Sequence, residues 1–321
     1  MSGDYGLRVS LPAAISSLQK YPTLYLNLVG QVASMQGAIP AHLAARVQFI
    51  EATQVVGMDE KPAHALRHKT DSSMRIALDL LSRQEVDAVV SAGNTGALMA
   101  MSVVVLKTLA GIERPAFCAP LPTHKGHCFL LDLGANVDCS ATQLQQFAWM
   151  GSALVQTLDR IDSPRVGLLN IGAEAIKGNE QVKNAAQLLA ADERINYVGY
   201  VEGDSLFADA ADVVVCDGFV GNVALKVCEG TARLVRAKIR RVFTSNTLAR
   251  LLGALAQPVL NALRDELDPQ RYNGAVLLGL QGTVIKSHGN STAESFEQAI
   301  AVAAQAVQND LVGSIRRCLQ R

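Results

Sequence analysis

The sequence lacks an excess of charge of either sign, and this limits what the protein can bind. Its 321 residues carry 29 Lys and Arg against 29 Asp and Glu, so the formal net charge is zero. A broad nucleic-acid surface needs a basic excess to neutralise phosphates, so nucleic acid is not an expected partner. Aromatic residues are also scarce, at 5%, whereas 49% of the chain is hydrophobic. That balance excludes disorder and favours helices packed on a buried parallel sheet over a β-sandwich.

Signatures of several familiar enzyme classes are also missing. The six cysteines form no Cys-x-x-Cys pair and most lie in apolar runs, so we interpret them as reduced, structural residues of a cytoplasmic protein. The chain contains no GxxxxGK[ST], HExxH or GxSxG motif, and no GxGxxG follows a strand. We therefore expect no resident metal and no cofactor. The longest uncharged stretch, 88–106, is interrupted by a polar glycine loop and does not predict a membrane span.

One pattern recurs along the chain and predicts the fold class. A short β-branched run ends in a Gly/Asn/Asp loop, and an Ala-rich helical stretch follows. Continuous apolar strands that alternate with helices are typical of a doubly wound, mostly parallel α/β sheet. We expect residues 1–321 to form one α/β unit. The predicted strands cover 86–90, 129–133, 166–171 and 213–216, and the helices that follow them cover 97–109, 141–158, 179–191 and 222–243.

The segment 233–272 departs from this pattern and is interpreted as a helical excursion from the α/β unit. Its apolar part, 251–263, has 13 uncharged residues and is too short to span a bilayer. A helix pair that packs on the core or on a twin subunit is the simpler interpretation. An amphipathic anchor, peripheral at the inner face of the cell membrane, is the alternative.

Three loops combine glycine with short polar side chains at predicted carboxyl ends of strands, where ligands bind in open α/β sheets. They cover 91–96, 171–179 and 217–222. Free backbone N–H groups at a helix start attract an anion, although the same residues also serve tight turns and helix caps. Three such loops in one sheet favour a phosphate-sized ligand. The candidate substrate-binding residues are Asn94, Thr95, Gly96, Gly172, Gly178 and Gly218.

A fourth polar string, Lys286-Ser287-His288-Gly289, follows an apolar strand near the carboxyl end of the chain. A lysine and a histidine at a strand end could bind an anion and move a proton. The alternative is a glycine-containing turn with a solvated lysine.

Together these stretches resemble the bacterial phosphate acyltransferases of phospholipid synthesis, the PlsX family. The resemblance covers essentially the whole chain, and it depends on the order and spacing of several short motifs. They are KP at 61–62, RHKTDSSM at 67–74, SAGNTGAL at 91–98, RPA at 114–116, LDLGAN at 131–136, NIG at 170–172, KG at 177–178, DGFVGNVALK at 217–226 and IKSHG at 285–289.

The resemblance implies transfer of a fatty acyl group from acyl carrier protein to inorganic phosphate, giving acyl phosphate. It also implies a homodimer, a fold similar to the phosphate acetyltransferases and the isocitrate dehydrogenase group, and a functional link to a membrane glycerol-3-phosphate acyltransferase. One departure stands out. The family begins with a strand before a Met-Gly-Gly-Asp-x-Gly-Pro loop, and here that loop corresponds to residues 1–7. The first core strand is thus missing, which predicts a gap in the parallel sheet.

In such a reaction phosphate is itself the nucleophile, so no acyl-enzyme is needed. The protein must hold a dianion against a thioester, stabilise the oxyanion and help the thiolate leave. Our hypothesis places Asn94, Thr95, Lys177 and Asn222 around the phosphate and the carbonyl. His288 is the candidate proton donor to the leaving thiol, with Lys286 near it.

Two other functions remain open on the sequence alone. A metal- and NAD(P)-dependent dehydrogenase of similar fold would need clustered Asp residues near a strand end, and there Asp132 and Asp138 form the only close pair. The second alternative is a non-catalytic protein that binds an anion.

Two surfaces are predicted for partners. The helix expected over 293–311 is rich in Ala and sparsely charged, which suits packing against another helix of a dimer. Acyl carrier protein is acidic, so a neutral enzyme needs a local basic patch to attract it. The densest basic run has five cations in nine residues, namely Arg233, Arg236, Lys238, Arg240 and Arg241.

Overall fold

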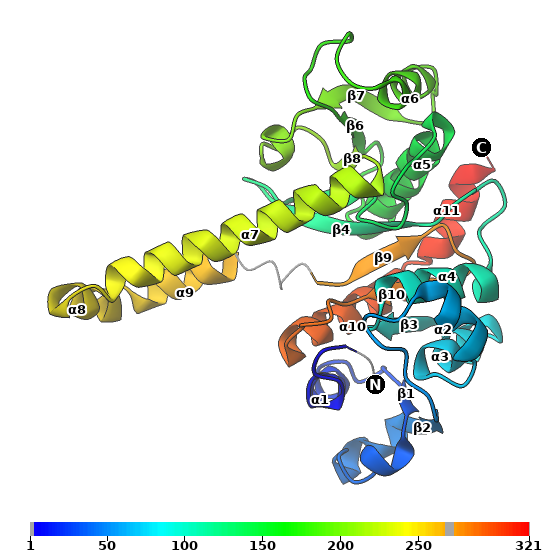
Figure 1. Ribbon diagram of the computed structural model, residues 1–321, viewed down its shortest axis with the longest axis vertical. Coiled ribbons are helices and arrows are strands. Elements are labelled where there is room, and N and C mark those ends of the chain that lie inside the picture. The colour runs from blue at the N-terminus through cyan, green and yellow to red at the C-terminus, as the bar shows by residue number, and fades with distance from the viewer. Residues whose placement is uncertain (1–2, 267–272, 321) are drawn as a thin grey trace.

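The computed structural model describes residues 3–266 and 273–320 (Figure 1). An eight-stranded mixed sheet has the order β3-β10-β9-β4-β5-β8-β6-β7, and a separate parallel pair is formed by β1 and β2. The strands are β1 (Leu26–Gly30), β2 (Val47–Glu51), β3 (Ala88–Ser91), β4 (Ala116–Pro122), β5 (His127–Leu131), β6 (Arg165–Leu169), β7 (Asn196–Val201), β8 (Val213–Val215), β9 (Ala275–Leu278) and β10 (Thr283–Lys286).

Most helices begin at a short polar residue whose side chain accepts from a backbone N–H of the first turn, as at Ser72, Ser140 and Asp217. The helices are α1 (Leu7–Lys20), α2 (Pro62–His68), α3 (Ser73–Ser82), α4 (Thr95–Leu106), α5 (Ala141–Leu158), α6 (Glu180–Ala190), α7 (Gly218–Phe243), α8 (Thr247–Leu255), α9 (Gln257–Glu266), α10 (Ala293–Gln308) and α11 (Leu311–Leu319), with short 3-10 turns at Val32–Ser34, Ala41–Arg46 and Ser205–Phe207.

The predicted fold class is confirmed. Strand pairs β3–β10, β5–β8, β6–β8 and β6–β7 are parallel, whereas β9 and β4 introduce antiparallel pairs in the middle of the sheet. Successive side chains of a strand point to opposite faces of the sheet and so pack into different hydrophobic clusters. Cys118 of β4 packs with α5, α10 and α11, while Phe117 and Ala119 face the side that carries α3 and α4. The six cysteines are free thiols and four of them are buried, in agreement with a structural role.

The helical excursion begins earlier than predicted. Helix α7 runs from Gly218 for 26 residues and projects as an arm, with α8 at the end farthest from the sheet and α9 leading back toward it (Figure 1). Gly253 of α8 packs against Phe243 at the end of α7. The pair α8 and α9 therefore follows the arm and does not lie on the core. The predicted end of the excursion, 267–272, lies outside the described residues. Among the helices of residues 3–266 and 273–320, none has the length and apolarity needed to cross a bilayer.

The Ala-rich helix near the carboxyl end is used inside the chain. It ends at Gln308, not at residue 311, and α11 follows. Ala299, Ala303 and Ala306 are buried in the core, and Glu297 accepts a hydrogen bond from Ser16 of α1 at 2.6 Å. The small-residue face that predicted packing against another subunit is therefore covered by this chain. The predicted dimer needs another surface.

A cavity of about 520 Å³ separates β1 from β3. Residues of both strands line it together with α1 and α10. Within residues 3–266 and 273–320, β1 pairs only with β2 and β3 pairs only with β10. The amino-terminal segment enters at the carboxyl end of β3, where Gly3 lies against Ala92 and the Asp4 N–H donates to the Gly289 carbonyl at 2.8 Å. The missing first strand stays a prediction.

We expect that an extended segment of alternating apolar residues, joined ahead of Met1, would pair with β1 and β3 and raise the melting temperature by several degrees. Two free strand edges would gain backbone partners, and the cavity would fill. Calorimetry measures the gain, and hydrogen exchange checks protection of the amides of β1 and β3. The control is the same segment with two prolines, which cannot donate to the ladder. Equal melting temperatures for the two extensions would refute the prediction.

Candidate active site

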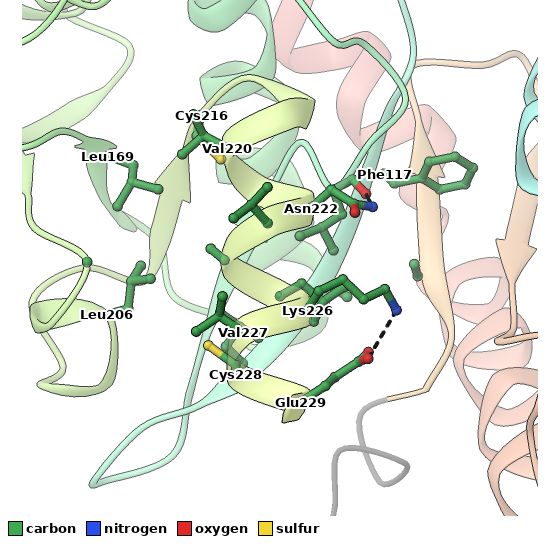
Figure 2. Close-up of a pocket in the computed structure, with 18 of the residues that line it drawn as sticks. Phe117, Leu169, Leu206, Cys216, Val220, Asn222, Lys226, Val227, Cys228 and Glu229 are labelled. Atoms are coloured by element: carbon green, nitrogen blue, oxygen red, sulfur yellow. Dashed lines mark hydrogen bonds and ion pairs between the residues drawn. The ribbon is translucent and has the colours of Figure 1, made fainter. Parts of the chain in front are cut away.

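A cavity of about 1340 Å³ lies between α7 and the sheet. Its apolar wall comes from alternate residues of β4, from Leu169 at the end of β6, and from the underside of α7. Figure 2 shows Leu206, Val227 and Cys228 on one side of α7, while Asn222, Lys226 and Glu229 extend on the other. The apolar wall includes Phe117, Ala119, Leu121, Leu133, Leu169, Leu206, Phe207, Val220, Val223, Val227 and Val235.

The first turn of α7 is held close to the loop after β5 by two glycines. A Cβ on Gly221 would lie 1.9 Å from the Asp132 carbonyl oxygen, and one on Gly218 would lie 2.5 Å from the Asn136 carbonyl oxygen. Any larger residue would force the helix away. Beyond this anchor Ala224 and Leu225 pack against the core, and Val223, Val227 and Val235 of α7 line the cavity.

Four charged or titratable side chains meet at one corner of the cavity. The Lys226 ammonium lies 3.0 Å from Glu229 Oε2, and His288 Nε2 lies 3.4 Å from Glu229 Oε1. Lys286, at the end of β10, is 9% exposed, and its ammonium donates to the Ser287 carbonyl. We call Lys226, Glu229, Lys286 and His288 the polar corner.

The environment of the polar corner favours neutral forms of its bases. Burial, with the charge of Lys226 acting in the same direction, lowers the pKa of Lys286 to about 8, while Asp4 opposes the change. Burial also lowers the pKa of His288, and Lys226 and Lys286 lower it further, whereas Glu229 raises it. The pKa of Lys286 is thus moved toward neutral pH, whereas His288 is moved toward its neutral form.

A buried polar network fixes the backbone beneath the polar corner. The Asn273 amide donates to Ser287 Oγ at 2.8 Å and to the Ser295 carbonyl at 2.6 Å, and its oxygen accepts from the His288 N–H at 3.0 Å. Ser287 and Ser291 share a hydrogen bond of 2.7 Å. His288 therefore stands on a rigid base.

The Asn94 side chain is occupied at both ends. Its oxygen caps α4 by accepting from the Ala97 N–H at 3.0 Å, and its amide donates to the carbonyls of Gly57, Met58 and Glu60. Thr95 lines the cavity, and Gly96 allows close approach of Pro62, whose Cγ would lie 2.7 Å from a Cβ there. In this structure Asn94 thus shapes the loop, and its predicted contact with substrate stays a prediction.

Asn222 and the loop after β6 line other parts of the cavity. Asn222 lies one turn before Lys226, and its amide donates to the Leu133 carbonyl at 3.0 Å. Gly178 lines the far end, where Asn170 holds the loop through the carbonyls of Gly172 and Lys177. Gly218 is buried under the start of α7 and faces the loop after β5.

Lys177 is exposed and is not brought together with Lys286 and His288. Five strand spacings separate β6 from β10 in the sheet order, which is about 24 Å of sheet width at ~4.8 Å per strand. Gly178 and His288 therefore line opposite ends of one cavity, and Lys177 itself is not among its lining residues. The role of Lys177 stays a prediction.

The predicted docking arginines lie along the exposed surface of α7. Arg233 is the nearest to the polar corner, 3.8 Å from Glu229 Oε2, and Arg240 and Arg241 occupy the last turn. Arg236 is exposed between them.

Sequence reasoning gave no role to Lys226, Glu229 or Asn273. Their spacing could have indicated a pair, because Lys226 and Glu229 are three residues apart on the helix that follows a glycine loop and so lie on one face of it. Their meeting with His288 depends on how α7 crosses the sheet. Asp132, which a metal-dependent alternative would need, accepts from the N–H groups of Phe117, Ala135 and Asn136. No group of three or more His, Cys, Asp and Glu side chains in the described parts of the chain is placed to hold a metal ion.

Solved structures share this architecture. A branched-chain phosphotransacylase from Enterococcus faecalis is similar with a TM-score of 0.55 and 12% identity, over 92% of this chain and 94% of that one. A 4-hydroxythreonine-4-phosphate dehydrogenase from Klebsiella pneumoniae is similar with a TM-score of 0.50 and 14% identity, over 94% of this chain and 96% of that one. These likenesses show the fold class, an α/β fold with a mostly parallel sheet that a phosphotransacylase and a dehydrogenase share. They do not separate transferase from dehydrogenase.

Sequence relatives are more specific. A protein named phosphate acyltransferase from Pseudomonas syringae pv. tomato is 54% identical over 97% of this chain and 92% of its own length. One of the same name from Ectopseudomonas mendocina is 51% identical over 97% of this chain and 93% of its own. The profile of the family described as fatty acid synthesis protein matches residues 1–313. The chain belongs to this family, as its resemblance to the phosphate acyltransferases predicted.

Replacing Asn94 with Ala should destabilise the fold by more than the ~1 kcal/mol typical of a lost helix cap, because three carbonyls also lose their donor. Chemical denaturation measures the loss. Asn179→Ala is the matched control, since Asn179 caps α6 through the Val182 N–H alone. Equal losses for the two variants, with activity lost only in Asn94→Ala, would instead assign the Asn94 amide to substrate.

Proposed function

We propose that this protein transfers a fatty acyl group from acyl carrier protein to inorganic phosphate and so produces an acyl phosphate. The observation that supports this most is a single cavity with an apolar wall and a cationic corner. The apolar wall formed by β4 and α7 suits an acyl chain. Lys226, Lys286 and His288 suit a phosphate dianion and a developing oxyanion.

The chemistry needs no covalent enzyme intermediate. A phosphate oxygen attacks the thioester carbonyl, the C–S bond breaks, and the carrier thiolate takes a proton. His288 is the proposed proton donor. Lys286 lies beside it with a pKa of about 8, close to the ~8.5 of a free thiol, so it can share or replenish that proton. Thr95 and Asn222 are the proposed contacts to phosphate and carbonyl, which act mainly by orientation. Lys177 lies apart from His288, so its proposed role is to attract the phosphate anion toward the cavity.

The alternative functions have less support. The dehydrogenase likeness is one of fold at 14% identity, whereas the relatives above half identity carry the acyltransferase name. A non-catalytic anion-binding role would leave the long apolar wall without a purpose. The acyltransferase class is therefore the conclusion that both the cavity and the relatives favour.

Partners follow from the same proposal. We propose acyl carrier protein as donor, a homodimer, and delivery of the product to a membrane glycerol-3-phosphate acyltransferase. The arm formed by α7, α8 and α9 is the proposed surface for peripheral contact with the inner face of a membrane in a cytoplasmic protein. Leu248, Leu251 and Leu255 are exposed there, close to Arg240 and Arg241.

The purified protein should consume acyl carrier protein thioester only when phosphate is present, with release of free thiol and formation of acyl phosphate. Lys177→Ala should lower turnover without changing the melting temperature, because the Lys177 side chain is exposed and not part of the core. Lys183→Ala, the next lysine along the chain, is the control. Phosphate-independent consumption, or reduction of a nicotinamide cofactor, would overturn the proposed function. Unchanged turnover in Lys177→Ala would refute only the role of Lys177 and would leave the proposed function standing.

Reversing Arg236 and Arg240 to Glu should raise KM for acyl carrier protein severalfold and flatten its dependence on salt. Charge attraction between an acidic carrier and the basic face of α7 would be lost, while the polar corner would stay intact. Steady-state kinetics over a salt series measures both effects. A double reversal of Arg316 and Arg317 on α11 is the charge-matched control. The same KM in both double variants would place the docking surface elsewhere.

A further inference from the structure

Glu229 is a buried carboxylate that the proposed chemistry does not use. It is 8% exposed, and it is the only buried residue of α7 other than two glycines. A carboxylate taken out of water needs charged or hydrogen-bonding partners to be tolerated. Its burial on a helix that otherwise faces solvent and the cavity therefore needs an explanation from its contacts.

The two oxygens of Glu229 serve different elements. Oε2 lies 3.0 Å from the Lys226 ammonium and 3.8 Å from the Arg233 guanidinium, both on α7. Oε1 lies 3.4 Å from His288 Nε2, which comes from the loop after β10. Figure 2 shows the Lys226–Glu229 pair on the side of α7 opposite Val227 and Cys228. Glu229 is thus an ion-pair link between the arm helix and the loop that carries the proposed proton donor.

We propose that Glu229 is a positioning residue that orients the His288 ring toward the cavity and stabilises the imidazolium that donates a proton to the leaving thiolate. This inference rests on the proposed function. The backbone of His288 is already fixed by Asn273, so the ring is the part left for Glu229 to orient. Glu229 touches no reacting atom in this scheme and acts through its neighbours.

The charges around His288 determine the sign of the effect. Lys226 from α7 and Lys286 from β10 both disfavour the imidazolium, as does burial, and Glu229 alone among the named neighbours favours it. Arg233 faces Glu229 from α7, and Asp4 of the amino-terminal loop acts on Lys286. When the Glu229 carboxylate is removed, the remaining influences, which are burial and the charges of Lys226 and Lys286, all disfavour protonation of His288. The pKa of His288 then falls, and less of the proton donor is available at neutral pH.

The test compares Glu229→Gln, Glu229→Asp and the full-length wild type. In Glu229→Gln we expect the pKa of His288 to fall by about one unit, because an opposite charge this close contributes at least that much. Turnover near neutral pH should fall by about tenfold, and the alkaline limb of the pH profile should move to lower pH. KM for phosphate should not rise, since Lys226 and Arg233 lose their internal partner. Glu229→Asp should recover part of both effects.

Two readouts keep the outcomes distinct. Titration of His288 by NMR, assigned with His288→Gln, requires no acyl transfer. Asp79→Asn, which removes a carboxylate from an ion pair with Arg75 on α3, is the control for loss of a helix ion pair. A His288 titration unchanged in Glu229→Gln would overturn the inference even if turnover fell. A shifted titration in a protein that transfers no acyl group would support the positioning role and overturn the proposed function.

Discussion

The close approach of α7 to the loop after β5 is the constraint on which the site depends. Gly218 and Gly221 let the first turn of the helix touch the backbone of Asp132 and Asn136. Asp132 is buried, and its oxygens are satisfied by backbone N–H groups on both sides of the turn. Beyond this clamp Ala224 and Leu225 still pack against the core, and the helix then projects away from the sheet (Figure 1). The cavity lies under this part of α7, where Val227 and Val235 line it.

The same geometry sets the electrostatics. An apolar wall next to a cluster of cations lowers the local dielectric, which strengthens each interaction with an anion and also makes an unpaired charge costly. Lys286 responds with a lowered pKa, and Lys226 is balanced by Glu229. The polar corner therefore carries a modest net positive charge, because Glu229 offsets the charge of Lys226. That balance suits a site that must admit phosphate and then release a product.

Much of the fold follows from local sequence, and the site follows only in part. The apolar runs and capped helices predicted the strands near 129–133 and 213–216, because burial on both faces leaves a clear signature. The glycine loops that follow strands, 91–96, 171–179 and 217–222, were also predicted from the sequence. What local patterns do not contain is strand order, and β9 and β4 insert between β10 and β5. This separates Lys177 from His288, although both follow strands in the sequence.

Side-chain use is the second limit on prediction. Asn94 and Asn222 are equally plausible ligand residues by type and position, yet the amide of Asn94 donates to three carbonyls of a loop more than thirty residues earlier. Glu229 shows the converse case. Three residues after Lys226 it resembles an ordinary surface ion pair, and only the approach of α7 to the loop after β10 places it beside His288. Long-range packing thus decides which polar groups remain free for chemistry, and the anchoring of one helix turn decides that packing here.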